Sequence, residues 1–133
     1  MSRSNRSARD AGTRFERSVA DYLARALGDD RIDRRAKRGA KDMGDIAGAR
    51  MHGREVVIEC KDYGGRLELP GWLDEAERER GNADAAYGVV VAKRKGVANP
   101  ADQYVVMTLE TFAAMMAGGP ELLEGEGDGV QGD

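Results

Sequence analysis

The sequence is poor in the residues that supply several common kinds of site. It has one cysteine, Cys60, so no disulfide can form within the chain and a zinc site built on cysteines is not expected. Only 5% of the residues are aromatic, and His52 is the only histidine. No apolar run approaches the roughly 18 residues of a membrane span, and the opening MSRSNRSARD lacks the apolar stretch of a secretory signal. These absences predict a cytoplasmic protein that does not enter a membrane.

The chain has 133 residues, which is enough for one domain with a hydrophobic core. Its net charge is -3, but the charges are distributed unevenly. Residues 1–61 carry 15 basic and 10 acidic side chains, whereas residues 62–133 carry 6 basic and 14 acidic ones. The basic half can therefore present a positive field to a polyanion, although a solvated charged surface would give the same counts.

Apolar residues recur at helical or strand spacing along most of the chain. The spacing predicts a helix over 10–27, strands over 31–36, 45–50 and 54–61, a helix over 70–82, strands over 86–95 and 104–110, and a last helix over 109–118. This order, α-β-β-β-α-β-β-α, predicts an α/β domain. We place the domain at residues 10–119, between a flexible basic arm over 1–9 and a disordered acidic tail over 120–133 that has too few apolar residues to pack.

The strand over 54–61 ends in two opposite charges. Side chains alternate across a strand, so Glu59 and Lys61 share one face, about 7 Å apart, while Cys60 points into the core on the other face. Asp45 begins the preceding strand, and a turn at 52–53 would bring its carboxylate to Glu59. Two converging carboxylates form a hard-oxygen site of the kind that Mg²⁺ accepts, and a lysine beside it can hold or activate an attacking water.

Asp45 followed by "ECK" at 59–61 resembles the signature of the PD-(D/E)xK nucleases, an Asp and then Glu-x-Lys on the next strand. The resemblance implies a restriction-endonuclease-like fold, with a central mixed sheet flanked by helices. It also implies that Asp45 and Glu59 bind the metal and that Lys61 is the catalytic lysine. Gly44 stands where the signature has Pro, and Asp42 is a rival to Asp45 as the metal ligand.

Glu16 lies in or beside the apolar stripe of the first helix, where an acid without a role is not expected. A pair with Arg17 or Arg35 is one explanation. The run from Gly12 to Leu109 resembles archaeal-type Holliday-junction resolvases and, more closely, resolvase-like proteins of actinobacterial phages. The resemblance implies that Glu16 joins the site as a catalytic residue and metal ligand. It also implies a two-fold homodimer acting in a bacterial or phage-infected cell.

Basic residues gather before Asp45 and after the strand over 86–95. Such clusters can grip phosphates, although solvated loops would look the same. The candidate DNA-binding residues are Arg34, Arg35, Lys37, Arg38, Lys41, Lys93, Arg94 and Lys95.

No helix-turn-helix or zinc-finger pattern that would read bases is present, which favours recognition of DNA shape. We therefore expect a Mg²⁺-dependent, structure-selective DNA endonuclease, with Mn²⁺ able to take the place of Mg²⁺. The favoured activity is resolution of Holliday junctions, that is, cleavage of phosphodiester bonds at four-way DNA junctions. Two alternatives are a restriction- or repair-type nuclease of the same fold acting on duplex DNA, and a non-catalytic DNA-binding module.

Overall fold

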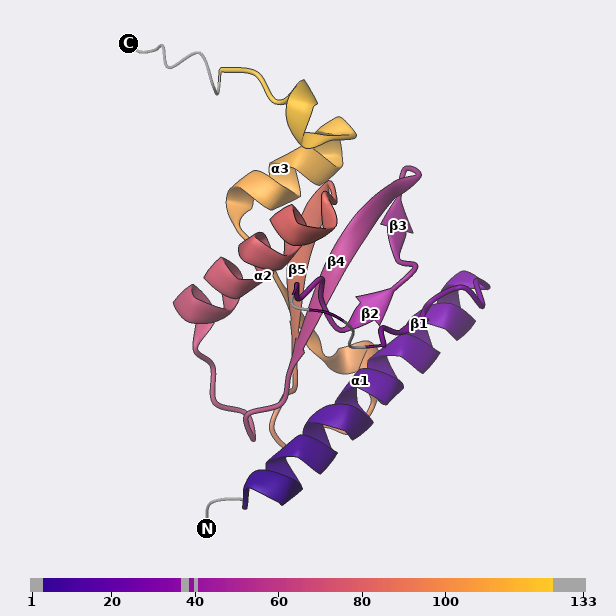
Figure 1. Cartoon of the computed structure of the whole chain (residues 1–133), viewed down its shortest axis with the longest axis vertical. Coiled ribbons are helices and arrows are strands. Elements are labelled where there is room, and N and C mark those ends of the chain that lie inside the picture. Colours follow the sequence, from indigo (N-terminus) through magenta and orange to yellow (C-terminus); the bar gives the residue numbers. More distant parts are fainter. Residues whose placement is uncertain (1–3, 37–38, 40, 126–133) are drawn as a thin grey trace.

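The computed structural model describes residues 4–36, 39 and 41–125, which form an α/β domain with a mixed sheet (Figure 1). In chain order the elements are α1 (Asn5–Leu27), β1 (Asp33–Arg34), β2 (Ile46–Ala47), β3 (Arg50–Met51), β4 (Arg54–Lys61), α2 (Leu69–Ala83), β5 (Tyr87–Ala92), η1 (Pro100–Asp102), β6 (Tyr104–Val106), α3 (Leu109–Ala117) and η2 (Pro120–Leu122). The predicted order of helices and strands is confirmed, except that two short strands, β2 and β3, stand where one strand was predicted over 45–50. Within the described residues, no helix is long and apolar enough to cross a membrane.

The sheet has the strand order β1-β2-β4-β5-β6, and β3 pairs with the N-terminal end of β4. Strands β4 and β5 are parallel and are joined through α2, whereas the other pairs are antiparallel. The turn predicted at 52–53 connects β3 and β4, and both of its residues have positive φ, 53° at His52 and 75° at Gly53. Two successive positive φ values suit the twist of a tight hairpin.

The two long helices cover opposite faces of β4 and β5. Phe15 and Val19 of α1 pack with Ile58 and Cys60 in one apolar cluster. Trp72 and Ala76 of α2 pack with Val90 and Ala92 in a second cluster. Since side chains alternate along a strand, Glu59 and Lys61 belong to the α2 face, while Cys60 packs in the core on the α1 face as predicted.

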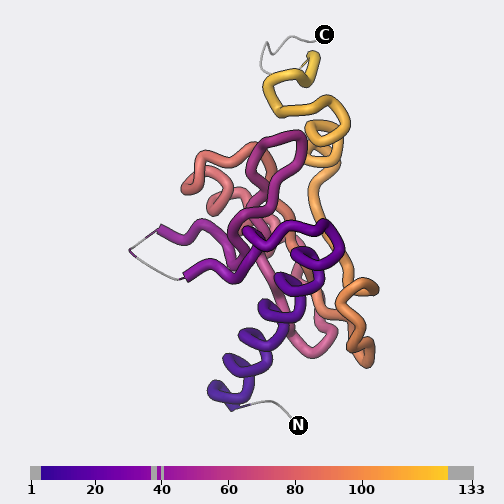
Figure 2. The backbone as a smooth tube through the Cα atoms, turned by 90° about the vertical axis from the view of Figure 1, so that its right-hand side faces the viewer, coloured from indigo at the N-terminus to yellow at the C-terminus, as the bar shows by residue number. Residues whose placement is uncertain are grey.

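The segment predicted as one strand over 45–50 is interrupted at Gly48, and β2 and β3 stand in its place. Gly48 has φ 88°, and a Cβ at this position would overlap the carbonyl of Arg31. A residue with a side chain would therefore have to displace the backbone of the neighbouring segment. The segments that lead into residue 36 and out of residue 41 project from the body side by side (Figure 2).

Both predicted domain boundaries need correction. Helix α1 begins at Asn5 rather than Asp10, because the Ser4 hydroxyl accepts a hydrogen bond from the Ser7 amide at 3.1 Å and caps the helix. Residues 5–9 are therefore helical and not a flexible arm. At the other end, residues 120–122 form η2, and Leu123 packs against the core. Residues 1–3 and 126–133 lie outside the described residues.

Candidate active site

Glu59 and Lys61 meet at the end of β4, as their shared face predicts. Lys61 Nζ lies 3.1 Å from Glu59 Oε2 and 2.7 Å from Glu75 Oε1, so the ammonium is held between a carboxylate of the sheet and one of α2. Glu59 is only 5% exposed. A buried charge is costly unless it is paired, and the lysine supplies one partner for the Glu59 carboxylate.

Asp45 lies directly before β2 and is buried at 3% exposure. Its backbone amide donates to the Ile58 carbonyl at 2.8 Å, and its side-chain Oδ2 accepts from the Cys60 amide at 2.8 Å. These bonds hold the Asp45 carboxylate beside the backbone of the Glu-Cys-Lys segment. The charge on Asp45 is one of the causes that raise the pKa of Glu59. The predicted juxtaposition of Asp45 and Glu59 is therefore present.

The backbone at Gly44, where the PD-(D/E)xK signature has proline, has a conformation that proline cannot adopt. Its φ is 96°, whereas the proline ring fixes φ near -65°. A Cβ on Gly44 would lie 2.9 Å from Cγ1 of Val57 and 3.2 Å from the Ile58 carbonyl oxygen. The approach of this loop to β4 thus requires glycine, and the same approach places Asp45.

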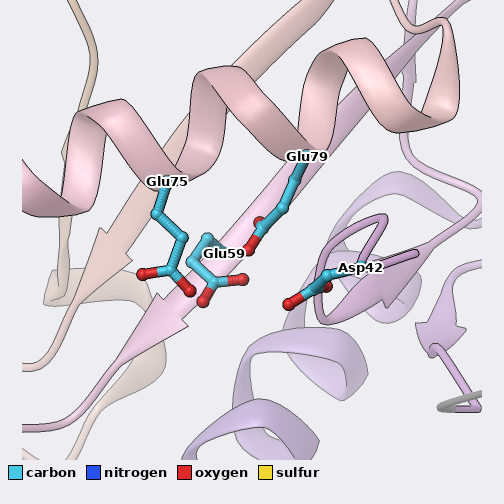
Figure 3. Close-up of side chains that lie close together, drawn as sticks. All are labelled: Asp42, Glu59, Glu75 and Glu79. Atoms are coloured by element: carbon cyan, nitrogen blue, oxygen red, sulfur yellow. The ribbon is translucent and has the colours of Figure 1, made fainter. Parts of the chain in front are cut away.

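Four carboxylates converge on the α2 face of β4 (Figure 3). Asp42 comes from the loop before β2, Glu59 from β4, and Glu75 and Glu79 from α2. One oxygen of each residue lies within 4.8 Å of one oxygen of every other. Asp42 was the rival to Asp45 in the sequence, and the structure places it in this cluster, whereas Asp45 lies beside Glu59 without being one of the four.

Glu75 and Glu79 were not predicted as site residues, although the sequence contains a signal for Glu79. Trp72, Ala76 and Glu79 follow one another at spacings of four and three, which places them on the same face of a helix. The first two residues belong to the apolar face of α2, and Glu79 is 1% exposed. The argument that made Glu16 a candidate therefore applies with more force to Glu79.

Some buried carboxylate oxygens of the cluster accept no hydrogen bond from neighbouring donor groups. Glu59 Oε1 and both carboxylate oxygens of Glu79 are buried and have no hydrogen-bond partner among the described residues. Burial, with the charges of Asp45 and Glu79 in addition, raises the pKa of Glu59 to about 10. Burial, with the charge of Asp42 in addition, raises the pKa of Glu79 to about 8. At neutral pH these carboxyls hold protons unless a cation replaces them.

Lys61 and Glu75 behave as an ion pair. Burial lowers the pKa of Lys61, but its contacts with Glu75 and Glu59 outweigh burial, and the net pKa lies above the ordinary value. Burial raises the pKa of Glu75, but the hydrogen bond from Lys61 outweighs it, and the net pKa is lowered. Lys61 is therefore a charged ammonium, suited to donating a hydrogen bond and to stabilising negative charge.

Glu16 lies elsewhere. It sits on α1, which covers the other face of β4, and its Oε1 accepts hydrogen bonds from Nε and Nη2 of Arg34 at 3.2 and 3.1 Å. Arg34 is thus a partner of Glu16, whereas Arg17 and Arg35, the partners that the sequence suggested, pair with Asp21 and Asp33 and with Glu55. Glu16 is not among the four clustered carboxylates.

The predicted DNA-binding residues fall into two groups. Arg34 and Arg35 are engaged in ion pairs with Glu16 and Glu55, at 3.1 and 3.0 Å. Lys41 is exposed, while Lys37 and Arg38 lie outside the described residues.

The second group follows β5. The Lys93 amide donates to the Lys61 carbonyl at 2.9 Å, which places residues 93–95 at the edge of the sheet that carries Lys61. Lys93 Nζ donates to the Arg94 carbonyl at 2.9 Å, the Arg94 guanidinium lies 5.1 Å from the ring centroid of Tyr104, and Lys95 is exposed.

No protein-family model, curated protein or solved structure matches the chain. What the site can do is therefore inferred from its own residues. It combines oxygen ligands for a hard cation, an ammonium that can contact a phosphoryl oxygen or a water, and basic side chains at the same edge of the sheet.

Proposed function

We propose that this protein is a Mg²⁺-dependent, structure-selective DNA endonuclease with a restriction-endonuclease-like fold, and that it cleaves phosphodiester bonds at four-way junctions. The observation that carries the proposal is the meeting of Asp45, Glu59 and Lys61 at one end of β4, with a buried oxygen of Glu59 left without a hydrogen bond among the described residues. These residues resemble the PD-(D/E)xK signature, and the resemblance implies that Asp45 and Glu59 bind the metal and that Lys61 is the catalytic lysine. The α/β mixed sheet is compatible with that fold.

The residues fit the metal that the signature implies. Every donor in the cluster is a carboxylate oxygen, the ligand type that Mg²⁺ and Mn²⁺ prefer, and one buried oxygen of Glu59 has no donor within the described part of the chain. Asp45 and Glu59 would hold the ion. When bound, the ion would stabilise the negative charge that develops on the phosphoryl oxygens and favour ionisation of a nearby water.

Lys61 then has a defined task. Its pKa lies above the ordinary value, so at neutral pH it carries a proton and cannot act as a general base in this state. The ammonium can instead donate hydrogen bonds to the attacking water or to a phosphate oxygen and hold it beside Glu59. Glu75, at 2.7 Å, restricts the direction in which the ammonium points.

The DNA would contact three lysines close to the site, Lys41, Lys93 and Lys95, which we call the basic rim. Lys41 and Lys95 are exposed, and Lys93 lies next to the end of β4, so all three could neutralise phosphates close to the carboxylates. Cleavage of a four-way junction needs two cuts, and a two-fold homodimer would supply two such sites. We place this activity in the cytoplasm of a bacterial or phage-infected cell, as the resemblance implies.

A cleavage assay on matched substrates tests the proposal. A four-way junction and a linear duplex of the same arm sequence are incubated with the protein in Mg²⁺, in Mn²⁺ and in chelator. We expect divalent-dependent cleavage of the junction in preference to the duplex. Asp45→Asn and Glu59→Gln should lower the rate by at least about 100-fold while leaving DNA binding intact, since they remove charge stabilisation rather than phosphate contacts.

The control is Glu77→Gln, which removes an exposed carboxylate of α2 that pairs with Arg80. Its cleavage rate should equal that of the wild type. Equal cleavage of junction and duplex would make the protein a duplex nuclease of the same fold. Junction binding without cleavage in any divalent ion would make it a binding module and would overturn the enzymatic proposal.

A further inference from the structure

We propose that Glu79 of α2 is a cation ligand, and that Glu79, Glu59 and Asp42 together bind a divalent metal ion on the α2 face of the sheet. This inference deepens the proposed function, on which it rests for the catalytic use of the ion but not for its binding. It keeps Glu59 from the proposed site, adds Asp42, the rival of Asp45 in the sequence, and places the acidic ligand from a helix on α2 instead of α1, where the resemblance expects Glu16.

The first support is convergence from three separate elements. Asp42 belongs to a loop, Glu59 to β4 and Glu79 to α2, and their carboxylate oxygens, with those of Glu75, lie within 4.8 Å of one another. Figure 3 shows Glu79 pointing from the helix toward the strand, with Asp42 reaching in from the other side. Like charges gathered from three elements repel one another unless a cation or protons lie among them.

The second support is the state of the Glu79 carboxylate. The residue is 1% exposed, and neither of its oxygens accepts a hydrogen bond from a described amide, hydroxyl or basic side chain; only the carboxyls of Glu59 and Asp42 lie within reach, and they can bond to it only by sharing a proton. An unpaired buried carboxyl is among the most costly groups in a protein interior. Its neighbours on the same helix face, Trp72 and Ala76, are apolar, so an apolar residue at position 79 would suit the packing better. Binding of a cation by this carboxylate would explain why an acidic residue occupies position 79.

Lys61 does not supply the positive charge that the Glu79 carboxylate lacks. Its ammonium contacts Glu59 and Glu75, at 3.1 and 2.7 Å, and within the described part of the chain no ion pair joins it to Glu79 or Asp42. Glu75 is thus assigned to holding the lysine, while Figure 3 shows Glu79 and Asp42 on the other side of Glu59 from Glu75. A metal ion placed among Glu59, Glu79 and Asp42 would supply positive charge on this side.

The loop that carries Asp42 is fastened to α2. Asn82, three residues after Glu79, donates from its side-chain amide to the Asp42 carbonyl at 2.9 Å. Asp42 Oδ1 in turn accepts from the Gly44 amide at 3.0 Å. These bonds position the Asp42 carboxylate relative to the helix before any ion arrives. A preformed arrangement lowers the ordering cost that binding would otherwise carry.

The donor chemistry selects the class of ion. All four clustered side chains are carboxylates, with no imidazole or thiolate among them. Such a set suits Mg²⁺, Mn²⁺ or Ca²⁺ and is poorly matched to Zn²⁺ or copper.

Binding of Mn²⁺ in the absence of DNA tests the inference. Free Mn²⁺ is followed by its electron paramagnetic resonance signal as protein is added, for the wild type, Glu79→Gln, Glu79→Leu and the control Glu77→Gln. We expect saturable binding by the wild type and the control. Both Glu79 variants should bind at least about tenfold more weakly, the loss typical when a metal site is stripped of a supporting group. Melting curves in chelator establish that each variant is folded.

The outcomes separate this inference from the proposed function. Absence of Mn²⁺ binding to the folded wild type overturns the cation site. Wild-type affinity in both Glu79 variants, or an equal loss in Glu77→Gln, overturns the role of Glu79 even if junction cleavage is observed. Weakened binding in the Glu79 variants supports the inference even if no DNA is cleaved, and in that case the nuclease proposal alone fails.

Discussion

Glu75 and Glu79 lie one turn apart on α2, yet Glu75 is paired with Lys61 at 2.7 Å while both oxygens of Glu79 are buried without a hydrogen bond from any described residue. The two residues should therefore respond in opposite ways to loss of charge. In metal-free buffer, Glu75→Gln should lower the free energy of unfolding by roughly 1.5 kcal/mol, because it weakens a charged hydrogen bond to a partly buried lysine. Glu79→Gln should leave that free energy unchanged or raise it.

Urea denaturation of both variants in chelator measures this contrast. Glu77→Gln serves as the control, since its carboxylate is exposed on the same helix. Similar destabilisation by Glu75→Gln and Glu79→Gln would mean that Glu79 has a stabilising partner in solution.

The raised pKa values of Glu59 and Glu79 predict how stability depends on pH. A carboxyl with a folded-state pKa above its ordinary value keeps its proton longer in the folded protein. Its contribution is therefore complete below about pH 4.5 and is lost as the pH rises through the folded value. For Glu79 that value is about 8. The metal-free protein should lose stability steadily between about pH 5 and pH 8, a range above the titration of the carboxyls whose pKa values are lowered, such as Asp29 and Asp33.

Denaturation at about pH 5, 6, 7 and 8 in chelator measures the slope. Glu79→Gln should flatten it, because one of the two titrating groups is removed. Saturating Mg²⁺ should flatten the slope of the wild type as well, since the ion takes the place of the protons. A wild-type stability that does not change over this range contradicts the burial of uncompensated acid.

The basic rim gives a prediction about DNA. Lys41 and Lys95 are exposed and neither forms an ion pair with a described residue, whereas Arg34 and Arg35 are held by Glu16 and Glu55. Replacing both lysines by alanine should weaken junction binding. It should also reduce the slope of log affinity against log salt by about 0.9 for each phosphate that is no longer neutralised. The folded protein should be unaffected, and an unchanged slope would show that these lysines are only solvated.

The two arginines should behave differently in the same titration. Arg34→Ala and Arg35→Ala each remove half of a partly buried ion pair, so they should lower thermal stability whether or not they bind DNA. A quadruple alanine variant that includes them would mix the two effects. The lysine pair is therefore the cleaner probe of phosphate binding.

The C-terminal segment illustrates how much of this fold the sequence predicts. The helices, β4, β5 and the turn at 52–53 follow from apolar periodicity and turn residues, which are local signals. The packing of residues 120–125 does not, because these residues contact parts of the chain that are distant in sequence, as in the pair of Glu121 with Arg54, 67 positions away. Leu123 likewise packs against a core assembled from α1, β4 and β5.

The site residues differ in the same way: some follow from local sequence signals, and others depend on how distant parts of the chain pack. Asp45, Glu59 and Lys61 could be placed from strand alternation and a hairpin, since all three lie within one short stretch of chain. Glu79 required knowing that α2 covers the Glu59 face of the sheet, which depends on the connection between parallel strands β4 and β5. Glu16 failed to join the cluster for the same reason, because α1 covers the other face.

Truncation distinguishes the two parts of the C-terminal segment. Removing residues 126–133 should leave the melting temperature unchanged. Removing residues 120–133 should lower it by a few degrees, because Leu123 would no longer pack on the core and the Arg54–Glu121 pair could not form. Arg54→Ala in the full-length chain controls for the pair, which is more than a third exposed and should contribute little by itself. Equal melting temperatures for the two truncations would show that η2 does not dock in solution.

Glu16 provides the sharpest comparison between the resemblance and the structure. The resemblance makes Glu16 a metal ligand, whereas the structure pairs it with Arg34 at 3.1 Å, with side-chain exposures of 14% and 32%. If the pair is its role, Glu16→Gln should lower the free energy of unfolding by roughly 1 kcal/mol, equally in Mg²⁺ and in chelator, and Mn²⁺ affinity should stay at the wild-type value. If Glu16 is a ligand, the metal-free protein should keep its stability while the stabilisation by Mg²⁺ falls. Arg34→Gln separates the cases further, since it breaks the pair but leaves the carboxylate in place. Matching losses of stability in Glu16→Gln and Arg34→Gln, with normal Mn²⁺ binding in both, are the expected result; weakened Mn²⁺ binding in Glu16→Gln alone would return Glu16 to the metal site.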